Sequence, residues 1–511
     1  MKVLNCAQSK ALEKSAVEAG TGYLQLMENA GVSAVRFLSR KFGLARKHVV
    51  ILCGKGNNGG DGYVAARCLS ELDALVVVVL AEDFPATDIS LTMYERLNNT
   101  SVKIINYRED PELIEPLLHS ADYIIDAIYG TGFHGTVRQN LIPLFRAVKL
   151  SKATLISLDM PSGANCDTGT VEGECMEADY TISFSTLKNG HLIQPAQGFC
   201  GQVVVVPIGI GPKLIDRQKS ALEVTELAAV KAMLKPRIPE SNKGDYGRLL
   251  CLCGSDGMAG AAVMSVNAAV RCGAGIVEAA LPRSIYPIVA SHAVEPVFTL
   301  LDYLQSGELL PAGKAALSAA LSRASACLIG CGLGRSEAAA EMLYDILSDS
   351  QVPLIIDADG INILSENINR LKTVKVPVVL TPHPGEMARL LNTTAQDVQA
   401  HRLEYAVKFA TEHQVVLVLK GAGTIVAEPD GAAHFNMTGN AGMAKGGSGD
   451  VLAGMIASFV AQGVDPAKAA VGAVYLHGAV GDRCAKEFSQ RAMLPTDMIN
   501  MLPKLFLEIE R

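Results

Sequence analysis

The sequence predicts an α/β protein of two domains, and three observations lead to this prediction. The chain has 511 residues, more than the roughly 100–200 residues of one typical domain. Short aliphatic runs alternate with amphipathic segments of helical length, which is the pattern of parallel strands that are buried on both faces between helices. The motifs that follow these runs differ between the two halves, so we expect two different domains and no internal duplication.

The composition fits a globular protein that acts on small molecules. Hydrophobic residues make up 49% of the chain and charged residues 19%, so burial can offset the entropy of ordering the chain. The net charge of −7 and the lack of any block of like charge argue against a nucleic-acid or membrane partner. The longest aliphatic stretch, Ala74 to Ala81, is shorter than the ~18 residues of a membrane span.

The cysteines and the first residues indicate a cytoplasmic protein. The first residues contain no continuous apolar region followed by a cleavage site, so no signal peptide is predicted. The 12 cysteines lie mostly in apolar runs and form no CxxC pair. We therefore expect buried thiols in a reducing compartment.

The first half predicts two helices followed by a parallel sheet. Helical periodicity covers residues 8–20 and 22–41. The aliphatic runs that predict strands lie at 49–53, 75–80, 102–106, 123–126 and 154–159. Strand signals stop at Gly211, and a charged segment follows, so we place the two domains at residues 1–216 and 224–511.

The second half predicts another series of strands and helices. The series begins near residue 247. It continues through the segments CLIGCG, PLIID, VVLTPH and VVLVLKG, at residues 327–332, 353–357, 378–383 and 415–421. Three helical stretches follow Gly446, so this half is also α/β.

A glycine-rich segment, GKGNNGGDG at residues 54–62, follows the first predicted strand and leads into a helix. It contains GxGxxG, but Asp61 would place a carboxylate where the pyrophosphate of a dinucleotide rests, which argues against a Rossmann dinucleotide site. The backbone amides and the side chains of Asn57 and Asn58 suit a polar ligand or an ion. The alternative is a glycine-rich turn without a ligand.

Two aspartates end strands at the same predicted edge of the sheet. Asp126 closes YIID and Asp159 closes TLISLD, and ligands bind at the carboxyl ends of parallel strands. Either aspartate alone could instead cap a helix. Asn58, Asp126 and Ser162 supply hard oxygen atoms, the type that group I or II cations prefer, and no His/Cys cluster indicates zinc.

The segments GNNGGDG, DAIYGTG and DMPSG together resemble the NAD(P)HX epimerase domain, the YjeF N-terminal family, over about residues 1–213. The resemblance implies a Rossmann-like three-layer fold, and interconversion of the R and S forms of NADH or NADPH hydrated at C6 of the nicotinamide ring. It implies a potassium ion (K⁺) held by Asn58, Asp126 and Ser162, and catalytic roles for Asp126 and Asp159. The residues implied in substrate binding are Asn57, Asn58, Gly59, Gly60, Asp61, Gly130, Thr131, Gly132, Phe133, His134, Gly135, Thr136 and Asp159.

The strongest single signal in the second half is GGSGD, residues 446–450, at the start of a predicted helix. Free backbone amides and the helix dipole would point at one spot beside Asp450. That arrangement suits phosphoryl transfer, because the amides stabilise negative charge and Asp450 can accept the proton of an attacking hydroxyl. A purely structural helix start is the alternative. The chain has no GxxxxGK[ST], which excludes a Walker-type NTPase.

Other predicted strands of this half also end in polar side chains, which we expect at the same edge of the sheet. LVLKGAGT ends a strand at Lys420 with a glycine loop able to wrap a nucleotide phosphate. The ends of neighbouring strands carry Asp357, Asp359, His383 and Glu386. His383 stands between two prolines, which fits either a substrate contact or a rigid turn.

The second half resembles the ADP-dependent NAD(P)HX dehydratase family, the YjeF C-terminal or carbohydrate-kinase-like domain, through KGDYG, GCGLG, DADGINIL, TPHPGEMARL, LKGAGT and GMAKGGSGDVLAG. The resemblance covers about residues 224–511. It implies a ribokinase-like fold, ADP as co-substrate with Mg²⁺, and dehydration of the S hydrate to NAD(P)H with AMP and phosphate as products. The implied nucleotide-binding residues are Lys420, Gly421, Ala422, Gly423, Thr424 and Gly449, and those facing the hydrate are Ala261, Gly332, His383 and the catalytic Asp450.

A chain that joins these two families would repair nicotinamide nucleotides in two steps, with NAD(P)HX and ADP as its small-molecule partners, and we expect a homo-oligomer. Two other functions stay open. One is a small-molecule kinase, because the GGSGD loop serves kinases as well. The other is a non-catalytic nucleotide-binding regulator. The presence of Asp126, Asp159 and Asp450 favours an enzyme over a regulator.

Overall fold

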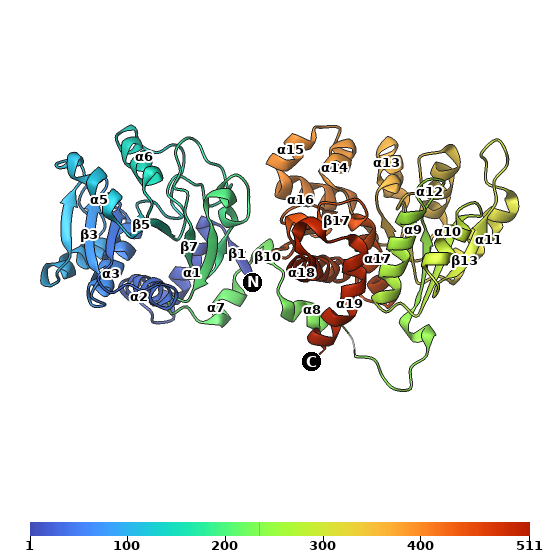
Figure 1. Cartoon of the computed structure of the whole chain (residues 1–511), viewed down its shortest axis with the longest axis horizontal. Helices are drawn as coiled ribbons and strands as arrows, with labels where there is room; N and C mark the ends of the chain where they lie inside the picture. Colours follow the sequence, from blue (N-terminus) through green and yellow to red (C-terminus); the bar gives the residue numbers. More distant parts are fainter. Residues whose placement is uncertain (235, 511) are drawn as a thin grey trace. The chain divides into compact units, whose positions relative to one another are not determined.

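The computed structural model describes residues 1–234 and 236–510. By their internal contacts the residues form two compact units, Met1–Leu222 and Glu223–Arg511 (Figure 1). Both units are α/β, as the sequence predicts. Within the described ranges, no helix combines the length and the apolar character that crossing a bilayer requires.

The first unit is built on a parallel sheet. Its strands lie in the order β4-β3-β2-β5-β6-β7-β9, and each neighbouring pair is parallel. The bounds are β2 (His48–Cys53), β3 (Leu75–Leu80), β4 (Lys103–Asn106), β5 (Tyr123–Ala127), β6 (Thr154–Leu158), β7 (Tyr180–Phe184) and β9 (Gln202–Val206). A short strand β1 (Lys2–Leu4) pairs in parallel with β8 (Leu187–Lys188).

Helices cover both faces of this sheet, because aliphatic strands expose side chains alternately on each side. Ile51 packs on one face with α2 (Tyr23–Lys41), α3 (Asn57–Ser70) and α4 (Asp88–Glu95). Leu52 packs on the other face with α5 (Ile114–Ser120) and α6 (Ile142–Leu150). The predicted three-layer, Rossmann-like fold is therefore confirmed. Helix α1 (Cys6–Glu18) packs its Leu12 and Ala16 against Leu26 and Ala30 of α2.

The order of the strands places a ligand crevice between β2 and β5. After β2, the chain adds β3 and then β4 on one side of it. The next strands, β5 and β6, are added on the other side of β2, so the order in which strands are added reverses between β2 and β5. The loops that leave β2 and β5 approach closely: the Gly54 amide donates to the Ala127 carbonyl at 3.0 Å. A Cβ on Gly54 would lie 2.1 Å from the Ile128 carbonyl oxygen, so only glycine fits.

The second unit has a parallel sheet that ends in an antiparallel hairpin. Its strands lie in the order β13-β12-β11-β14-β15-β16-β17-β18-β19, with β18 and β19 antiparallel. The bounds are β11 (Arg248–Leu252), β12 (Ile276–Pro282), β13 (Val297–Leu301), β14 (Ala326–Ile329), β15 (Leu354–Ile356), β16 (Val378–Leu380), β17 (Val416–Leu419), β18 (Ile425–Ala427) and β19 (Ala433–Phe435).

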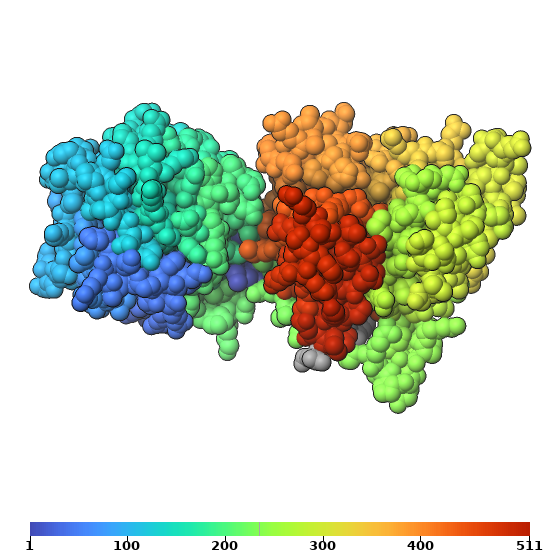
Figure 2. All heavy atoms as spheres, viewed as in Figure 1, coloured from blue at the N-terminus to red at the C-terminus, as the bar shows by residue number. Residues whose placement is uncertain are grey.

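One face of this sheet packs against a layer that contains the C-terminal helices. Leu249, Leu328 and Ile355 lie in one core cluster with residues of these helices. The helices are α9 (Ala259–Arg271), α17 (Ser448–Ala461), α18 (Pro466–Ala492) and α19 (Pro495–Ile509), and the last three correspond to the three helical stretches predicted after Gly446. Figure 2 shows the red C-terminal residues between the orange and the yellow-green parts of the same unit.

Further helices complete the second unit. Leu250, Leu252 and Ile329, whose side chains point to the opposite face of the sheet, are also buried. The remaining α-helices of this unit are α8 (Leu227–Met233), α10 (Tyr286–His292), α11 (Pro311–Arg323), α12 (Glu337–Asp349), α13 (Asp359–Glu366), α14 (Pro384–Leu391), α15 (Ala395–Ala400) and α16 (Arg402–His413).

Four strands of the second unit's sheet, β12, β13, β18 and β19, were missing from the predicted series. Strand β12 contains Glu278 and ends at Pro282, so its aliphatic pattern is interrupted. Glu278 is buried, and it accepts hydrogen bonds from Arg248 at 2.8 Å and from Thr299, on β13, at 2.6 Å. The Glu278 carboxylate is thus compensated by side chains from the neighbouring strands, which the sequence of β12 itself does not reveal.

The cysteines are free thiols, and only Cys68 and Cys175 are partly exposed. Burial raises the pKa of the Cys53 and Cys272 thiols. The prediction of buried thiols is confirmed.

We expect fragments 1–216 and 224–511 to fold separately, because the main core clusters of each unit contain residues of that unit alone. Each fragment should unfold cooperatively on heating, and the two circular dichroism spectra should add to that of the full chain. A fragment that is soluble only when the other is present would show that the predicted boundary is wrong.

Candidate active sites

A cavity of about 600 Å³ lies at the crevice of the first unit. It is lined by residues from the loops after β2, β5 and β6, the three segments that the sequence placed at one sheet edge. The predicted substrate-binding residues that line it are Asn57, Asn58, Asp61, Gly130, Thr131, Gly132, Phe133, His134, Thr136 and Asp159.

Three predicted residues, Gly59, Gly60 and Gly135, are not among those that line the cavity. A Cβ on Gly59 would lie 2.0 Å from the Gly54 carbonyl oxygen, and one on Gly60 would lie 2.4 Å from the sulfur of Met27. These two glycines therefore let α3 pack closely against the preceding loop and against α2. Gly135 has a φ of +78°, so it provides the left-handed turn of the loop after β5.

Asp159 forms the centre of a buried charged network in the part of the cavity that is lined by Glu13, Asp61, Asp159 and Lys188, which we call its inner end. Its side chain makes an ion pair with Lys188, whose side chain is 3% exposed. The Lys188 ammonium also donates to Ser183 Oγ and to the Phe184 carbonyl, both at 3.0 Å. Asp159 has a φ of +64°, a left-handed conformation that is uncommon outside glycine.

His191 fixes this network from behind. Its Nδ1 accepts from the Lys188 amide at 3.0 Å, so its Nε2 carries the proton and donates to the Asp159 carbonyl at 2.8 Å. Burial, together with the Lys188 charge, lowers the pKa of His191 to about 4. The sequence analysis missed Lys188 and His191, because a single lysine and histidine after a strand match no recognised motif.

Two more carboxyls face the inner end of the cavity, Glu13 on α1 and Asp61 on α3. Burial raises the pKa of Asp61 well above its usual range, and the charges of Asp159 and Glu13 raise it further. Burial also raises the pKa of Glu13, with Asp159 as the next cause. These groups therefore retain protons at a higher pH than ordinary carboxyls do.

Basic residues line another part of the cavity. Lys55 follows β2, and Arg138 follows the glycine loop after β5. Arg138 pairs with the buried carboxylate of Glu82 at 2.9 Å, and the Tyr129 hydroxyl donates to the same carboxylate at 3.0 Å. The ring of Tyr129 stacks on that of Phe133, with 4.8 Å between centroids. This part suits an anionic portion of a ligand.

Asp126 lies behind the cavity and is completely buried. Its carboxylate accepts from Ser162 Oγ at 2.5 Å, from the Ser162 amide at 2.8 Å and from Ser157 Oγ at 2.8 Å. Burial raises the pKa of Asp126, although these hydrogen bonds oppose the rise. The structure thus brings Asp126 and Ser162 together, and Asn58 donates to the neighbouring Leu158 carbonyl at 3.3 Å.

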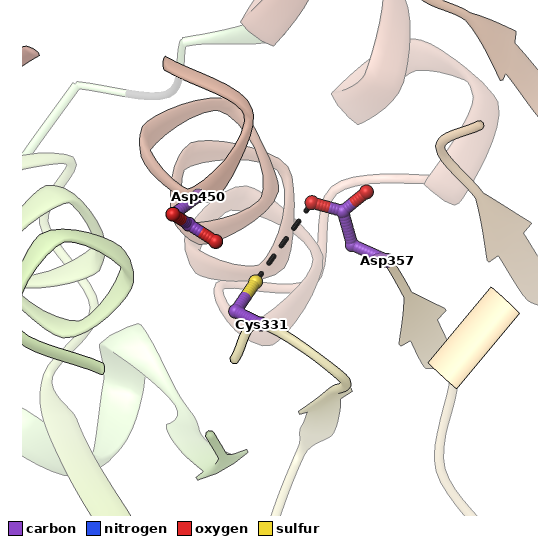
Figure 3. Close-up of side chains that lie close together, drawn as sticks. All are labelled: Cys331, Asp357 and Asp450. Atoms are coloured by element: carbon purple, nitrogen blue, oxygen red, sulfur yellow. Dashed lines mark hydrogen bonds between the residues drawn. The ribbon is translucent and has the colours of Figure 1, made fainter. Parts of the chain in front are cut away.

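In the second unit, Asp450 and Asp357 face the buried thiol of Cys331 (Figure 3). The ligand atoms of these three residues lie within 4.8 Å of one another. Asp450 stands in the first turn of α17, where the free amides of a helix start are located. Burial, and then the Asp357 charge, raises the pKa of Asp450 to about 7, a value suited to a general base at neutral pH.

Lys420 balances the carboxylates of this site. Its ammonium donates to Asp357 at 2.6 Å and lies 3.7 Å from Glu386. Burial alone would lower the pKa of Lys420, but the two carboxylates outweigh burial and raise it. A Cβ on Gly449 would lie 3.3 Å from the Lys420 ammonium, so the glycine brings the start of α17 close to this cation.

The loop from Lys420 to Thr424 is held from behind by Arg402, which the sequence analysis did not identify. The guanidinium donates to the carbonyls of Leu419, Lys420 and Gly423, at 3.1, 3.3 and 3.1 Å. Burial lowers the pKa of Arg402 to about 10. Because these carbonyls face Arg402, the loop has amide groups available on its other side, where an anion can bind.

The other residues predicted to contact a ligand in the second unit lie in the loops after strands and at helix starts. A Cβ on Gly332 would lie 2.7 Å from the Cβ of Ala261, so these two residues adjoin. His383 precedes α14, and its Nδ1 accepts from the Gly385 amide at 2.9 Å. The Glu386 carboxylate accepts from the His383 amide at 2.7 Å, so the segment is a rigid capped turn, and half of the His383 side chain is exposed. Asp359 accepts from the Gly334 amide at 2.9 Å.

Comparison with known protein families gives a match for each unit. A family model described as NAD(P)H-hydrate dehydratase matches residues 249–504. A second model, described as YjeF-related protein N-terminus, matches residues 23–190.

Similar proteins extend over nearly the whole chain. The bifunctional NAD(P)H-hydrate repair enzyme Nnr of Moorella thermoacetica is 39% identical over 491 residues, which covers 95% of this chain and 92% of the relative. The enzyme of the same name from Escherichia coli is 35% identical and covers 95% of this chain and 90% of the relative. A crystal structure of a ribokinase-like superfamily protein from Enterococcus faecalis is 28% identical, with a TM-score of 0.51, and covers 57% of this chain and 97% of that chain. The ribokinase-like fold of the second unit is thereby confirmed.

We expect Arg402→Met to lower the free energy of unfolding of the second unit by about 2 kcal/mol, because it leaves three carbonyls without their donor. Denaturant unfolding measures the loss, and amide hydrogen exchange at residues 421–424 should become faster. Arg389→Met is the control, since Arg389 is exposed and makes one hydrogen bond, to Asn362 at 2.9 Å. Equal effects of the two substitutions would contradict a specific role of Arg402 in the loop.

Proposed function

The chain belongs to the family of bifunctional NAD(P)H-hydrate repair enzymes, and we propose that its two units carry two successive activities. Met1–Leu222 would epimerise the hydrates of NADH and NADPH, and Glu223–Arg511 would dehydrate the S form with ADP. The observation that supports this proposal most is the extent of the similarity: it covers 95% of the chain and so includes both sites. A cytoplasmic location and a homo-oligomeric state are part of the proposal.

In the second unit, Asp450 would act as the base. It takes the proton of the C6 hydroxyl as this oxygen attacks the β-phosphoryl group of ADP, and AMP leaves. The amides at the start of α17 stabilise the charge on the phosphoryl oxygens. The ring nitrogen then expels the phosphate from C6, and loss of a proton from C5 restores the double bond of NAD(P)H. Hydrate and ADP thus become NAD(P)H, AMP and phosphate.

The nucleotide would bind between Lys420 and the loop that Arg402 holds. Gly421, Ala422, Gly423 and Thr424 supply backbone amides, and Gly449 lets the start of α17 approach Lys420. His383 is exposed enough to contact the hydrate, and Ala261 and Gly332 together form a small-residue surface. The Lys420 ammonium provides positive charge for the phosphates.

The cluster of Cys331, Asp357 and Asp450 does not fit a Mg²⁺ cage. Mg²⁺ prefers oxygen ligands in octahedral geometry, whereas the Cys331 thiol is buried and its pKa is raised by the neighbouring Cys253 and by burial. One oxygen of Asp357 is already bonded to Lys420. We therefore propose that Mg²⁺ enters on the phosphates of the nucleotide, and we derive no step from it.

The residues around Asp126 do fit K⁺. The donor set of Asn58, Asp126 and Ser162 contains oxygen ligands alone. Asp126 is completely buried, and among the described residues no basic side chain pairs with it. A bound cation would compensate this charge, which is costly to bury alone. Its chemical contribution would be to keep the loops after β5 and β6 in place.

The function is tested with hydrated NADH, ADP and Mg²⁺, by following the absorbance of the reduced nicotinamide ring and the release of phosphate together. The proposal predicts equal amounts of NADH, AMP and phosphate, with both epimers consumed. A stable phosphorylated acceptor would identify a kinase instead. Binding of ADP without turnover of the hydrate would identify a regulator.

We expect Asp450→Asn to reduce dehydration at least a hundredfold while the affinity for ADP stays within a few fold, since general-base losses are ~10²–10⁴ in rate. In the wild type the rate should rise with pH and level off above about pH 7, because the base must be ionised and its pKa is raised to about 7. Asp465→Asn is the control, since Asp465 only caps α18. A variant that keeps more than a tenth of the rate would remove Asp450 from this role.

We expect Asp126→Asn to cut exchange between the R and S hydrates at least a hundredfold with the fold intact. Wild-type protein should also melt at a higher temperature in K⁺ than in tetramethylammonium, and the variant should lose this difference. Asp122→Asn is the matched control, because Asp122 precedes the same strand and pairs with Lys47 at 2.8 Å near the surface. If Asp126 merely caps a turn, the substitution costs about 1 kcal/mol and little activity.

A further inference from the structure

Glu13, on α1, is a carboxyl that no sequence motif predicted. It precedes residue 23, where the match to the N-terminal family model begins. Glu13 lines the inner end of the cavity with Asp61, Asp159 and Lys188. Among the described residues, neither Glu13 nor Asp61 has a hydrogen-bond or ion-pair partner for its carboxyl group, whereas Asp159 is paired with Lys188. Both unpaired carboxyls are therefore available to a ligand.

The charges at this end of the cavity oppose ionisation of both carboxyls. The groups that face Glu13 are Lys10 on its own helix, Asp61 on α3, Asp159 after β6 and Lys188 on β8. Lys188 is already occupied by Asp159. Burial, and then the charge of Asp159, raises the pKa of both carboxyls, so each holds a proton at a higher pH than an ordinary carboxyl does.

The chemistry of the hydrate requires such a proton. C6 carries a hydroxyl and is bonded to the ring nitrogen, so the nitrogen lone pair can expel the hydroxyl once it is protonated. The C6–O bond breaks, water departs, and a planar N1–C6 iminium cation forms. Water then adds to the other face of C6 and returns a proton to the enzyme, so that protons and electrons balance and nothing is oxidised.

We propose that Glu13 is a further catalytic residue, which holds a proton in the same part of the cavity as Asp61 and donates it to the C6 hydroxyl of the hydrate. The inference rests on the proposed epimerase function of the first unit. The excess of carboxyls over free cations at this end stabilises the iminium cation as it forms. In the other part of the cavity, Lys55 and the guanidinium of Arg138, which also pairs with Glu82, would bind the pyrophosphate, and this would orient the nicotinamide ring toward Glu13.

The test compares Glu13→Gln with Glu18→Gln in the full chain. Glu18 lies on the same helix, is 68% exposed and is 3.9 Å from Lys14, so its substitution serves as the matched control. R-to-S exchange is followed by chromatography as a function of pH, after subtraction of the exchange without enzyme. Dehydration of the S hydrate by the second unit and thermal unfolding are measured on the same samples, and they report whether the protein is folded.

The expected result is a loss of at least about a hundredfold in exchange for Glu13→Gln and no loss for Glu18→Gln, with dehydration unchanged in both. Wild-type exchange should fall as pH rises through the raised pKa of Glu13, because the acid must be protonated. Glu13→Gln should lose this dependence, and Glu13→Asp should keep it at a lower rate.

Two results would overturn the role of Glu13. One is a Glu13→Gln protein that keeps more than a tenth of the exchange rate and the wild-type pH profile. The other is loss of the pH dependence in Asp61→Asn alone, which would make Asp61 the sole donor. Absence of exchange in the wild-type protein is a different outcome, since it would contradict the proposed epimerase function itself.

Discussion

A buried pair of one lysine and one carboxylate organises the site of each unit. Asp159 pairs with Lys188 in the first unit, and Asp357 pairs with Lys420 in the second. In both cases the carboxylate follows a parallel strand and the lysine comes from a different segment of the chain. A buried charge without such a partner is strongly destabilising. The pair therefore fixes the relative positions of the loops that form each site.

The pair also determines the state of the neighbouring carboxyls. Because one lysine is used by one carboxylate, the next carboxyl in the site lacks a full counter-charge, and burial raises its pKa. This is the situation of Asp61 beside Asp159 and of Asp450 beside Asp357. Strongly shifted carboxyls in a cavity or at a helix start are typical of functional sites. The same local arrangement thus yields a carboxyl with a raised pKa in two different folds.

The aliphatic runs predicted most strands, because strands buried on both faces leave an uninterrupted apolar signal. Strand β12 escaped prediction because Glu278 interrupts that signal, although its charge is balanced by Arg248. Motif residues such as Asp126, Asp159 and Asp450 were singled out because each lies at the end of a strand, directly after one, or in the first turn of a helix beside glycines. Lys188 and Arg402 were missed because their partners are distant in sequence or are backbone carbonyls, and neither leaves a local pattern. Glu13 was missed because it belongs to no motif and does not follow a strand of the sheet.

The surroundings of each shifted carboxyl decide in which direction it moves a proton. Asp450 lies in the first turn of α17, where amides and the helix dipole stabilise negative charge, so transfer of a proton to Asp450 leaves an oxygen anion in a favourable place. The inner end of the first cavity has three carboxyls, and its Lys188 is already paired with Asp159, so loss of a proton from Glu13 leaves a negative charge that favours a cation on the ligand. Under the proposed roles of Asp450 and Glu13, the same C6 hydroxyl would be deprotonated for phosphorylation in one unit and protonated for departure as water in the other. The chemistry of each unit thus follows from the sign of the field around its site, since a raised pKa alone would allow either role.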